Sequence, residues 1–165
     1  MKTGTSIVGI VCTDGVVLAA DRQASMGSMV GQKDAQKITK INDFLLGAIC
    51  GTASDAQYLM RIVAAELKLK DLKAKRRATV KESASLLATI SFRNIRSPSM
   101  IPSIVGTLVA GVDEDGKAKL YSVEPAGGVF EVKEYDTNFG SGTPYMVGVL
   151  ERMYKKEMNV KQGVQ

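Results

Sequence analysis

The sequence contains no histidine, and it has only two cysteines among 165 residues. The absence of histidine excludes catalysis by Ser-His-Asp or Cys-His arrangements and removes the commonest metal ligand. No apolar run approaches the ~20 residues that are needed to cross a bilayer. Residues 1–4 are too short and too polar for a secretory signal. We therefore expect a cytoplasmic protein of one domain that makes no contact with a membrane.

The two cysteines, Cys12 and Cys50, each lie in an apolar segment that is typical of a strand. They lack the C-x-x-C spacing of a zinc or redox site, so they are predicted to be small buried side chains in a reducing compartment. We expect no metal site.

The net charge of +5 is concentrated in one stretch, in which Lys68 to Lys81 contains a single acid, Asp71. Such a stretch can bind nucleic acid. However, no aromatic residue alternates with the basic ones to stack on bases. Basic side chains are also favoured at the end of a helix by the helix dipole. We therefore expect a solvated helix end or a contact with a partner subunit, and no nucleic-acid binding.

A threonine follows a glycine close to the N-terminus, at Gly4-Thr5. If the bond between them is cut, Thr5 gains a free α-amino group beside its own hydroxyl. This amine has an ordinary pKa of about 8, low enough to act as a base near neutral pH. The pair forms the threonine version of an activated nucleophile. The alternative is that Thr5 is only the first residue of a strand, because Gly-Thr is a common dipeptide.

The order of elements predicts an α+β domain with stacked layers. Period-2 and β-branched patterns predict strands in the first fifty residues, and again over 104–112, 119–123 and 129–132. Helical spacing predicts one helix after Thr52 or Ser54, with an apolar stripe of Ala56, Leu59, Met60, Val63, Ala64 and Leu67. A second helix is predicted from Thr79, with Glu82 completing a capping box. A third helix is expected to start with Thr143 as N-cap and Pro144 as its first residue. Its apolar stripe of Met146, Val149, Leu150 and Met153 is expected to be core.

Five segments resemble the archaeal type of proteasome β subunit, in the same order and with the same spacing. They are Thr5 to Val11, Asp14 to Ser25, Ala35 to Ile38, Gly51 with Ser54 to Gln57, and Gly140 to Pro144. Each segment alone is weak, but together they cover nearly the whole chain. The resemblance implies an N-terminal-nucleophile hydrolase, with two stacked antiparallel sheets between helical layers in an αββα sandwich.

The resemblance also implies roles for single residues. Thr5 would be the nucleophile, released when the bond after Gly4 cleaves itself. Lys37 would lower the pKa of neighbouring groups or move a proton, and Asp21 would hold Lys37 by a charge-assisted hydrogen bond. Ser141 would position the amine, and the backbone N–H of Gly51 would stabilise the oxyanion. Taken without the family, Asp21 and Lys37 could form an ordinary surface ion pair, and the residues around Ser141 a plain turn.

Substrate recognition follows from the same resemblance. The backbone of Ser25, Gly51 and Ala53 would pair with an extended peptide. The primary specificity pocket would be lined by Ala24, Ala35, Ile49 and Ala53. None of these side chains is charged, so cleavage after bulky apolar residues is expected.

The implied assembly is a closed chamber that degrades unfolded polypeptides. It consists of seven-membered rings of β subunits flanked by rings of α subunits, with a regulatory ATPase that feeds in the substrate. Residues 1–4 would be a removable leader and residues 5–165 the hydrolase domain.

The chain departs from the family pattern in two places. Ser6 and Ile7 replace the more usual threonines, which is a mild change. The family continues for several tens of residues past Gln165, with a helix, closing strands, and an aspartate and a serine near the threonine. Residues 159–165 are predicted to begin such a helix, and the domain is expected to be C-terminally incomplete. These departures leave open an inactive, unprocessed structural β-type subunit or, less favoured, a simpler bacterial chambered peptidase of the same superfamily.

Overall fold

The computed structural model describes residues 5–26 and 29–165, and its strands form two principal antiparallel sheets. The three-stranded sheet has the order β10-β1-β2, from β1 (Ile7–Cys12), β2 (Gly15–Ala20) and β10 (Tyr135–Asp136). The five-stranded sheet has the order β5-β6-β7-β8-β9. Its strands are β5 (Ile38–Asn42), β6 (Leu45–Gly51), β7 (Val105–Val112), β8 (Ala118–Val123) and β9 (Val129–Val132). A separate hairpin joins β3 (Ala24–Met26) to β4 (Met29–Gln32).

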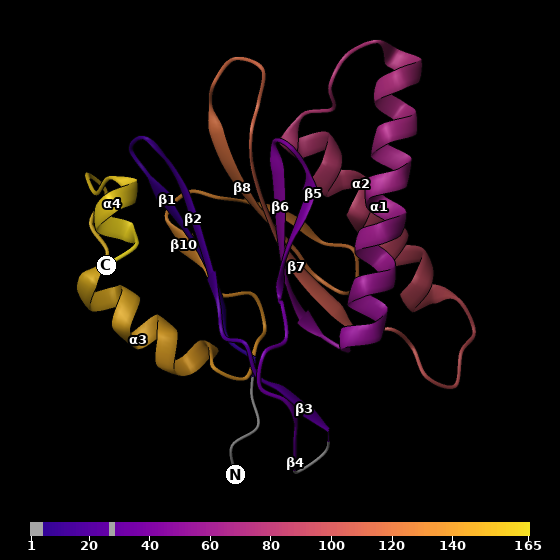
Figure 1. Ribbon diagram of the computed structural model, residues 1–165, viewed down its shortest axis with the longest axis horizontal. Coiled ribbons are helices and arrows are strands. Elements are labelled where there is room, and N and C mark those ends of the chain that lie inside the picture. The colour runs from indigo at the N-terminus through magenta and orange to yellow at the C-terminus, as the bar shows by residue number, and fades with distance from the viewer. Residues whose placement is uncertain (1–4, 27–28) are drawn as a thin grey trace.

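Helices cover the outer face of each sheet, which gives the predicted four-layer αββα sandwich (Figure 1). Helices α1 (Ala53–Ala74) and α2 (Val80–Arg96) lie on the five-stranded sheet. Helices α3 (Thr143–Met153) and α4 (Val160–Gly163) lie beside the three-stranded sheet. In the described part of the chain, no helix combines the length and the apolar character that crossing a bilayer demands.

The largest apolar core lies between α1, α2 and the five-stranded sheet. The predicted stripe of α1 is confirmed, because five of its side chains are buried: Ala56, Leu59, Met60, Val63 and Leu67. Burial of each of the larger side chains stabilises the fold by roughly 1.5–3 kcal/mol relative to leaving it exposed. The predicted capping box of α2 is also present, with Glu82 N–H donating to Thr79 Oγ1 and Thr79 N–H donating to Glu82 Oε2.

A second core fills the space between the two sheets, where Ile7 contacts side chains of β6, β7 and β8. Its strand residues are Ala48, Cys50, Leu108, Ala110 and Leu120. Cys12 and Cys50 are both buried and unpaired, as predicted. This layer fixes the three-stranded sheet, which carries the N-terminal residues, against the strand that ends at Gly51.

The prediction for α3 was wrong in two respects. Gly142 is the N-cap residue, so Thr143 and Pro144 are the first two residues of the helix. The apolar stripe is not core, since Val149 is 55% and Met153 is 60% exposed. The sheet beneath α3 has only three strands, and Leu150 is the stripe residue that packs on its outer cluster. The helix predicted for 159–165 is present as α4, a single turn.

Candidate active site

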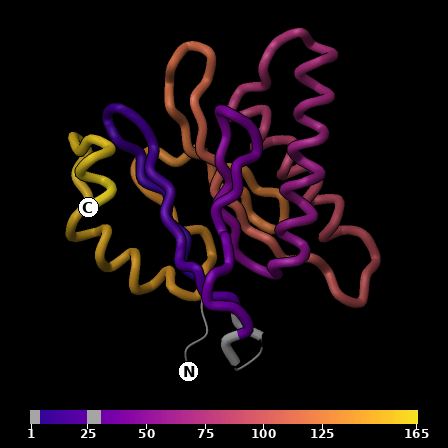
Figure 2. The backbone as a smooth tube through the Cα atoms, in the orientation of Figure 1, coloured from indigo at the N-terminus to yellow at the C-terminus, as the bar shows by residue number. Residues whose placement is uncertain are grey.

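The first residue of the site, Thr5, lies just before β1 and beside a loop that is distant in the sequence. Thr5 N–H donates to Ser141 Oγ at 2.9 Å, across a separation of 136 residues. Gly142 N–H donates in turn to Thr5 O at 3.1 Å. Figure 2 shows the start of β1 meeting the loop that precedes α3. The two hydrogen bonds between these segments hold Thr5 in place at one end of the sandwich.

The Gly140-Ser141-Gly142 turn needs its first glycine for close packing. A Cβ at Gly140 would lie 2.4 Å from the backbone oxygen of Thr5, so the chain would have to move to accept it. The missing side chain lets the turn approach the strand closely enough for the Ser141 hydroxyl to reach Thr5. The glycine before Ser141 is therefore required for a steric reason.

Asp21 follows β2 and is fixed to the start of β1. Its carboxylate accepts hydrogen bonds from Ser6 N–H at 2.7 Å and from Gln23 N–H at 2.9 Å. Partial burial opposes ionisation of Asp21. The hydrogen bonds from Lys37 and from these two amides outweigh it, and they hold the pKa of the carboxyl below its usual value. Asp21 is therefore an ionised acceptor near neutral pH.

Lys37 is buried, and all three of its ammonium hydrogens have acceptors. Nζ donates to Asp21 Oδ1 at 2.7 Å, to Asp21 Oδ2 at 2.8 Å and to Thr5 Oγ1 at 3.3 Å. Ile49 N–H donates to Lys37 O at 2.9 Å and so attaches the residue to β6 just before β5 begins. The ammonium has three donors and no acceptor, so it presents a fixed positive charge to the Thr5 hydroxyl.

Gly51 ends β6, and its backbone conformation requires glycine. Its φ is +118°, a region that residues with a side chain rarely adopt. A Cβ there would also lie 2.0 Å from Ile104 O. The residue is exposed at the groove, directly before α1, with no side chain to obstruct an approaching peptide.

A groove of about 910 Å³ contains most of the predicted site residues. Thr5, Lys37, Gly51 and Ser141 line it, as do the four residues predicted for the specificity pocket, Ala24, Ala35, Ile49 and Ala53. The backbone of Ser25 pairs with Val30 in the β3–β4 hairpin. Gly4 lies outside the described residues.

Sequence reasoning missed several residues that line the groove, namely Gln23, Gln32, Asp34, Cys50, Gln57 and Phe139. Asp34 pairs with Arg22 at 2.6 Å, and both side chains are largely exposed. Most of the missed residues are next to, or two positions from, a predicted one. Their adjacency to the motif residues was therefore the signal that could have found them.

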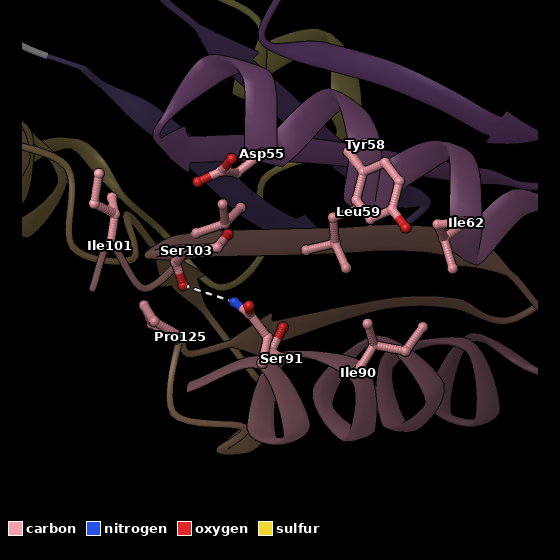
Figure 3. Close-up of a pocket in the computed structure, with 11 residues that line it drawn as sticks. Asp55, Tyr58, Leu59, Ile62, Ile90, Ser91, Ile101, Ser103 and Pro125 are labelled. Atoms are coloured by element: carbon pink, nitrogen blue, oxygen red, sulfur yellow. Dashed lines mark hydrogen bonds between the residues drawn. The ribbon is translucent and has the colours of Figure 1, made fainter. Parts of the chain in front are cut away.

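A second cavity, of about 300 Å³, lies between α1, α2 and β7 (Figure 3). Its walls are mainly apolar, with Tyr58, Leu59, Ile62 and Ile90 facing the space. Asn94 Nδ2 donates to Ser103 O at 2.9 Å on one side. None of the predicted site residues lines this cavity, so the chemically equipped groove is the one around Thr5.

Within residues 5–26 and 29–165, no group of three or more Cys, Asp or Glu side chains is placed to hold a metal ion. The groove instead offers the Thr5 hydroxyl, the Lys37 ammonium and the turn around Ser141, and the Asp21 carboxylate holds the ammonium from outside the groove. These groups suit attack by a hydroxyl on a carbonyl carbon.

Comparisons with known proteins agree with this arrangement. The family described as "Proteasome subunit" matches residues 1–165. The chain is 44% identical over 162 residues to the proteasome subunit beta of Methanobrevibacter smithii, covering 98% of this chain and 74% of that protein. It is 42% identical over 161 residues to that of Methanothermobacter thermautotrophicus, covering 98% and 73%. It is 39% identical over 162 residues to that of Ferroglobus placidus, covering 98% and 74%.

These similarities extend along nearly the whole of this chain, which spans about three quarters of the length of the relatives it matches. Two antiparallel sheets enclosed by helices agree with the fold that the sequence resemblance implied. The chain therefore belongs to the proteasome β-subunit family, of the archaeal type.

Proposed function

We propose that the chain is a catalytic β subunit of the proteasome core particle, a threonine-type endopeptidase that degrades unfolded polypeptides. One observation carries the proposal: the Thr5 hydroxyl lies 3.3 Å from the ammonium of Lys37, which Asp21 holds by two further hydrogen bonds. Proteasome β subunits are in general proteases, and this arrangement supports Thr5 as the nucleophile.

The α-amine of Thr5 is the proton acceptor in the proposed reaction. Lys37 is held in the ion pair with Asp21, where its ammonium offers donors and no acceptor. The amine takes the hydroxyl proton as Oγ1 attacks the peptide carbonyl carbon. Ser141 Oγ, which accepts from Thr5 N–H, fixes the orientation of the amine. The positive charge of Lys37 stabilises the oxygen as it loses its proton.

The remaining steps follow from the same groups. The backbone N–H of Gly51 donates to the oxyanion of the tetrahedral intermediate. The intermediate collapses when the leaving peptide nitrogen takes this proton from the α-amino group. The acyl part of the substrate stays on Thr5 Oγ1 as an ester. Water, deprotonated by the α-amine, then attacks the ester and releases the second product. No metal and no organic cofactor enters these steps.

Substrate would lie in the groove as an extended strand. The backbone of Ser25, Gly51 and Ala53 would pair with it, and a bulky apolar side chain would enter the pocket of Ala24, Ala35 and Ile49. The location of these last three residues on the wall of one groove with Thr5 supports this reading.

The reaction requires removal of residues 1–4, because Thr5 is blocked while Gly4 is attached. We assign residues 1–4 as a leader that is cleaved at Gly4-Thr5 by the Thr5 hydroxyl itself, and residues 5–165 as the hydrolase domain. The Ser141 hydroxyl is already placed against Thr5 N before cleavage, which supports a site assembled in advance.

Family membership implies assembly with other proteasome subunits. The proposed partners are β subunits in heptameric rings, flanking α subunits and a regulatory ATPase, in the cytoplasm. The apolar side of α3 supports subunit contacts, since Tyr145 is 81% exposed beside the exposed Val149 and Met153.

An intact-mass measurement tests the proposal, using the chain assembled with α subunits and a threonine-directed covalent inhibitor. We expect wild type to lose residues 1–4 and to gain one inhibitor adduct on Thr5. The matched variant Thr5→Ala should keep its leader and take up no inhibitor. A wild-type chain that keeps its leader and gains no adduct would reject the proposal and favour an inactive structural β-type subunit.

A further inference from the structure

Asn138 occupies an unusual backbone position three residues before Ser141. Its φ is +51°, and among the described residues it shares a positive φ outside glycine only with Lys75. Its N–H donates to Asp136 Oδ1, and its carbonyl accepts from Thr143 Oγ1 at 3.4 Å. The left-handed conformation turns the chain from β10 into the loop that holds Thr5. This conformation is tolerated by asparagine better than by most residues.

The side chain of Asn138 reaches from this loop into the five-stranded sheet. Its Nδ2 donates to Ser122 Oγ at 3.1 Å and to Val123 O at 3.3 Å, both at the end of β8. Thr107 O on β7 lies 3.5 Å from the same nitrogen. The amide therefore links the Ser141 loop to two strands of the sheet on which α1 and α2 pack.

The other end of the amide reaches β6. Cys50 Sγ lies 3.6 Å from Asn138 Oδ1, close enough for the thiol to donate to it. Burial raises the pKa of the Cys50 thiol to about 11, so the proton stays on sulfur near neutral pH. Cys50 immediately precedes Gly51, the proposed oxyanion donor. One side chain thus contacts both the segment that positions the amine and the segment that would bind the oxyanion.

The sheet contains a slot that fits this amide. Gly106 pairs with Cys50 across β6 and β7. A Cβ on Gly106 would lie 2.1 Å from Asn138 Oδ1 and 2.3 Å from the Phe139 ring. The absence of a side chain at Gly106 is therefore a condition for the insertion of Asn138.

We infer that Asn138 is a positioning residue for the reaction: its side-chain amide fixes the Ser141 loop in register with the Gly51 end of β6. We call this set of contacts, with Cys50, Gly106 and Ser122, the Asn138 clamp. The inference rests on the proposed function for its catalytic consequence, and on the contacts of Asn138 alone for its structural part. The clamp connects the Ser141 loop to the Gly51 end of β6, and the Lys37–Asp21 pair does not connect these two parts of the site.

The clamp predicts an effect on turnover and little effect on substrate binding. Asn138 does not line the groove, so its loss removes no contact with a peptide, and Gly51 remains paired with Val105 while the Ser141 loop is released. Loss of the clamp lets the amine and the oxyanion donor move relative to each other. A misplacement of about 1 Å can lower the rate about 100-fold. We therefore expect kcat to fall while KM stays nearly constant.

Asn138→Gly is the informative variant, because glycine adopts the same φ without strain and lacks the amide. Ser122→Ala removes the main acceptor at the far end of the clamp. Lys75→Gly is the matched control, because it relaxes the other positive φ, at the exposed C-cap of α1. Each variant is purified as the full chain with its partner subunits, and two properties are measured. These are kcat and KM on a short fluorogenic peptide, and amide hydrogen exchange over residues 139–143.

We expect Asn138→Gly to lower kcat about 10- to 100-fold, with KM within about twofold, and to speed exchange over 139–143. Ser122→Ala should lower kcat less, and it should add nothing in the Asn138→Gly background, because it acts through the same amide. If Asn138→Gly does not fold, Ser122→Ala alone supplies the test. Unchanged kcat and exchange in the folded variants, or an equal loss in Lys75→Gly, would overturn the clamp.

The exchange measurement separates failure of the clamp from failure of the proposed function. If wild type has no peptidase activity, the proposed function is rejected and the exchange comparison still decides the clamp. Faster exchange over 139–143 in Asn138→Gly then supports it, and unchanged exchange overturns it.

Discussion

Lys37 Nζ contacts both carboxylate oxygens of Asp21, at 2.7 Å and 2.8 Å, and uses its remaining hydrogen on Thr5 Oγ1 at 3.3 Å. The pair joins the residue before β5 to the residue after β2. Asp21 also accepts a hydrogen bond from Ser6 N–H, next to Thr5. The carboxylate therefore holds the Lys37 ammonium in one position relative to the Thr5 hydroxyl. The predictions that follow test this arrangement and the groove around it.

Exchange of either partner should abolish most activity, and exchange of both should cost little more. Lys37→Met removes the positive charge beside Thr5, and Asp21→Asn removes the carboxylate that holds this charge in place. Loss of a single pre-organised electrostatic contact typically lowers kcat about 100- to 1,000-fold. Because the two residues act as one unit, the double variant should resemble the singles. Fully multiplicative losses, measured by kcat on a short peptide, would show that the two residues act independently.

Asp21 should also make the free energy of unfolding depend on pH. Its pKa is lowered in the folded chain, chiefly through Lys37 and the two backbone amides acting against partial burial. Its contribution is therefore complete above the unfolded pKa of about 3.9, and it is lost as the pH falls through the folded pKa. Asp21→Asn removes this contribution.

Urea unfolding of wild type and Asp21→Asn at several pH values measures the effect. We expect wild type to be more stable by roughly 1–3 kcal/mol at pH 7, as for hydrogen bonds to a charged group. The difference should stay constant down to about pH 5 and shrink below pH 4. A difference that grows on acidification would contradict the direction of the pKa shift.

Gly140→Ala should disrupt the site, whereas Gly148→Ala should not. A Cβ at Gly140 would lie 2.4 Å from the backbone oxygen of Thr5, so the turn must move away from Thr5. At Gly148 in α3 nothing lies within 4 Å of an added Cβ. Alanine there should stabilise the helix by about 1 kcal/mol. The measurements are thermal unfolding and labelling of Thr5 by the covalent inhibitor. Equal labelling of the two variants would show that close packing of the turn is not needed.

Cleavage should be fastest after bulky apolar residues. The pocket residues Ala24, Ala35, Ile49 and Ala53 carry no charge, and the small side chains leave room for a large one. A peptide series with leucine, phenylalanine, arginine or glutamate before the cleaved bond measures the preference as kcat/KM. Fastest cleavage after arginine would contradict the assignment, and it would direct attention to Asp34, the acid that lines the same groove.

Local features of the fold were predictable from the sequence because they depend on residues a few positions apart. Helical spacing from Ala56 to Leu67 identified the buried side of α1, and Thr79 with Glu82 identified the start of α2. The strand over 129–132 was predicted with the bounds that the structure has. The exposed stripe of α3 was not predictable, since periodicity reveals an apolar face without revealing how wide a sheet lies beneath it.

The family, the layered α+β architecture and the candidate nucleophile could be identified from the amino-acid order alone, because they follow from motifs along the chain. Folding of the whole chain brings Thr5 to Ser141 across 136 residues, buries Lys37 against Asp21 and places Asn138 in the slot at Gly106. Such contacts depend on the register of paired strands and on the packing of one sheet against another. Local propensity does not encode them, because it extends over only about one helical turn.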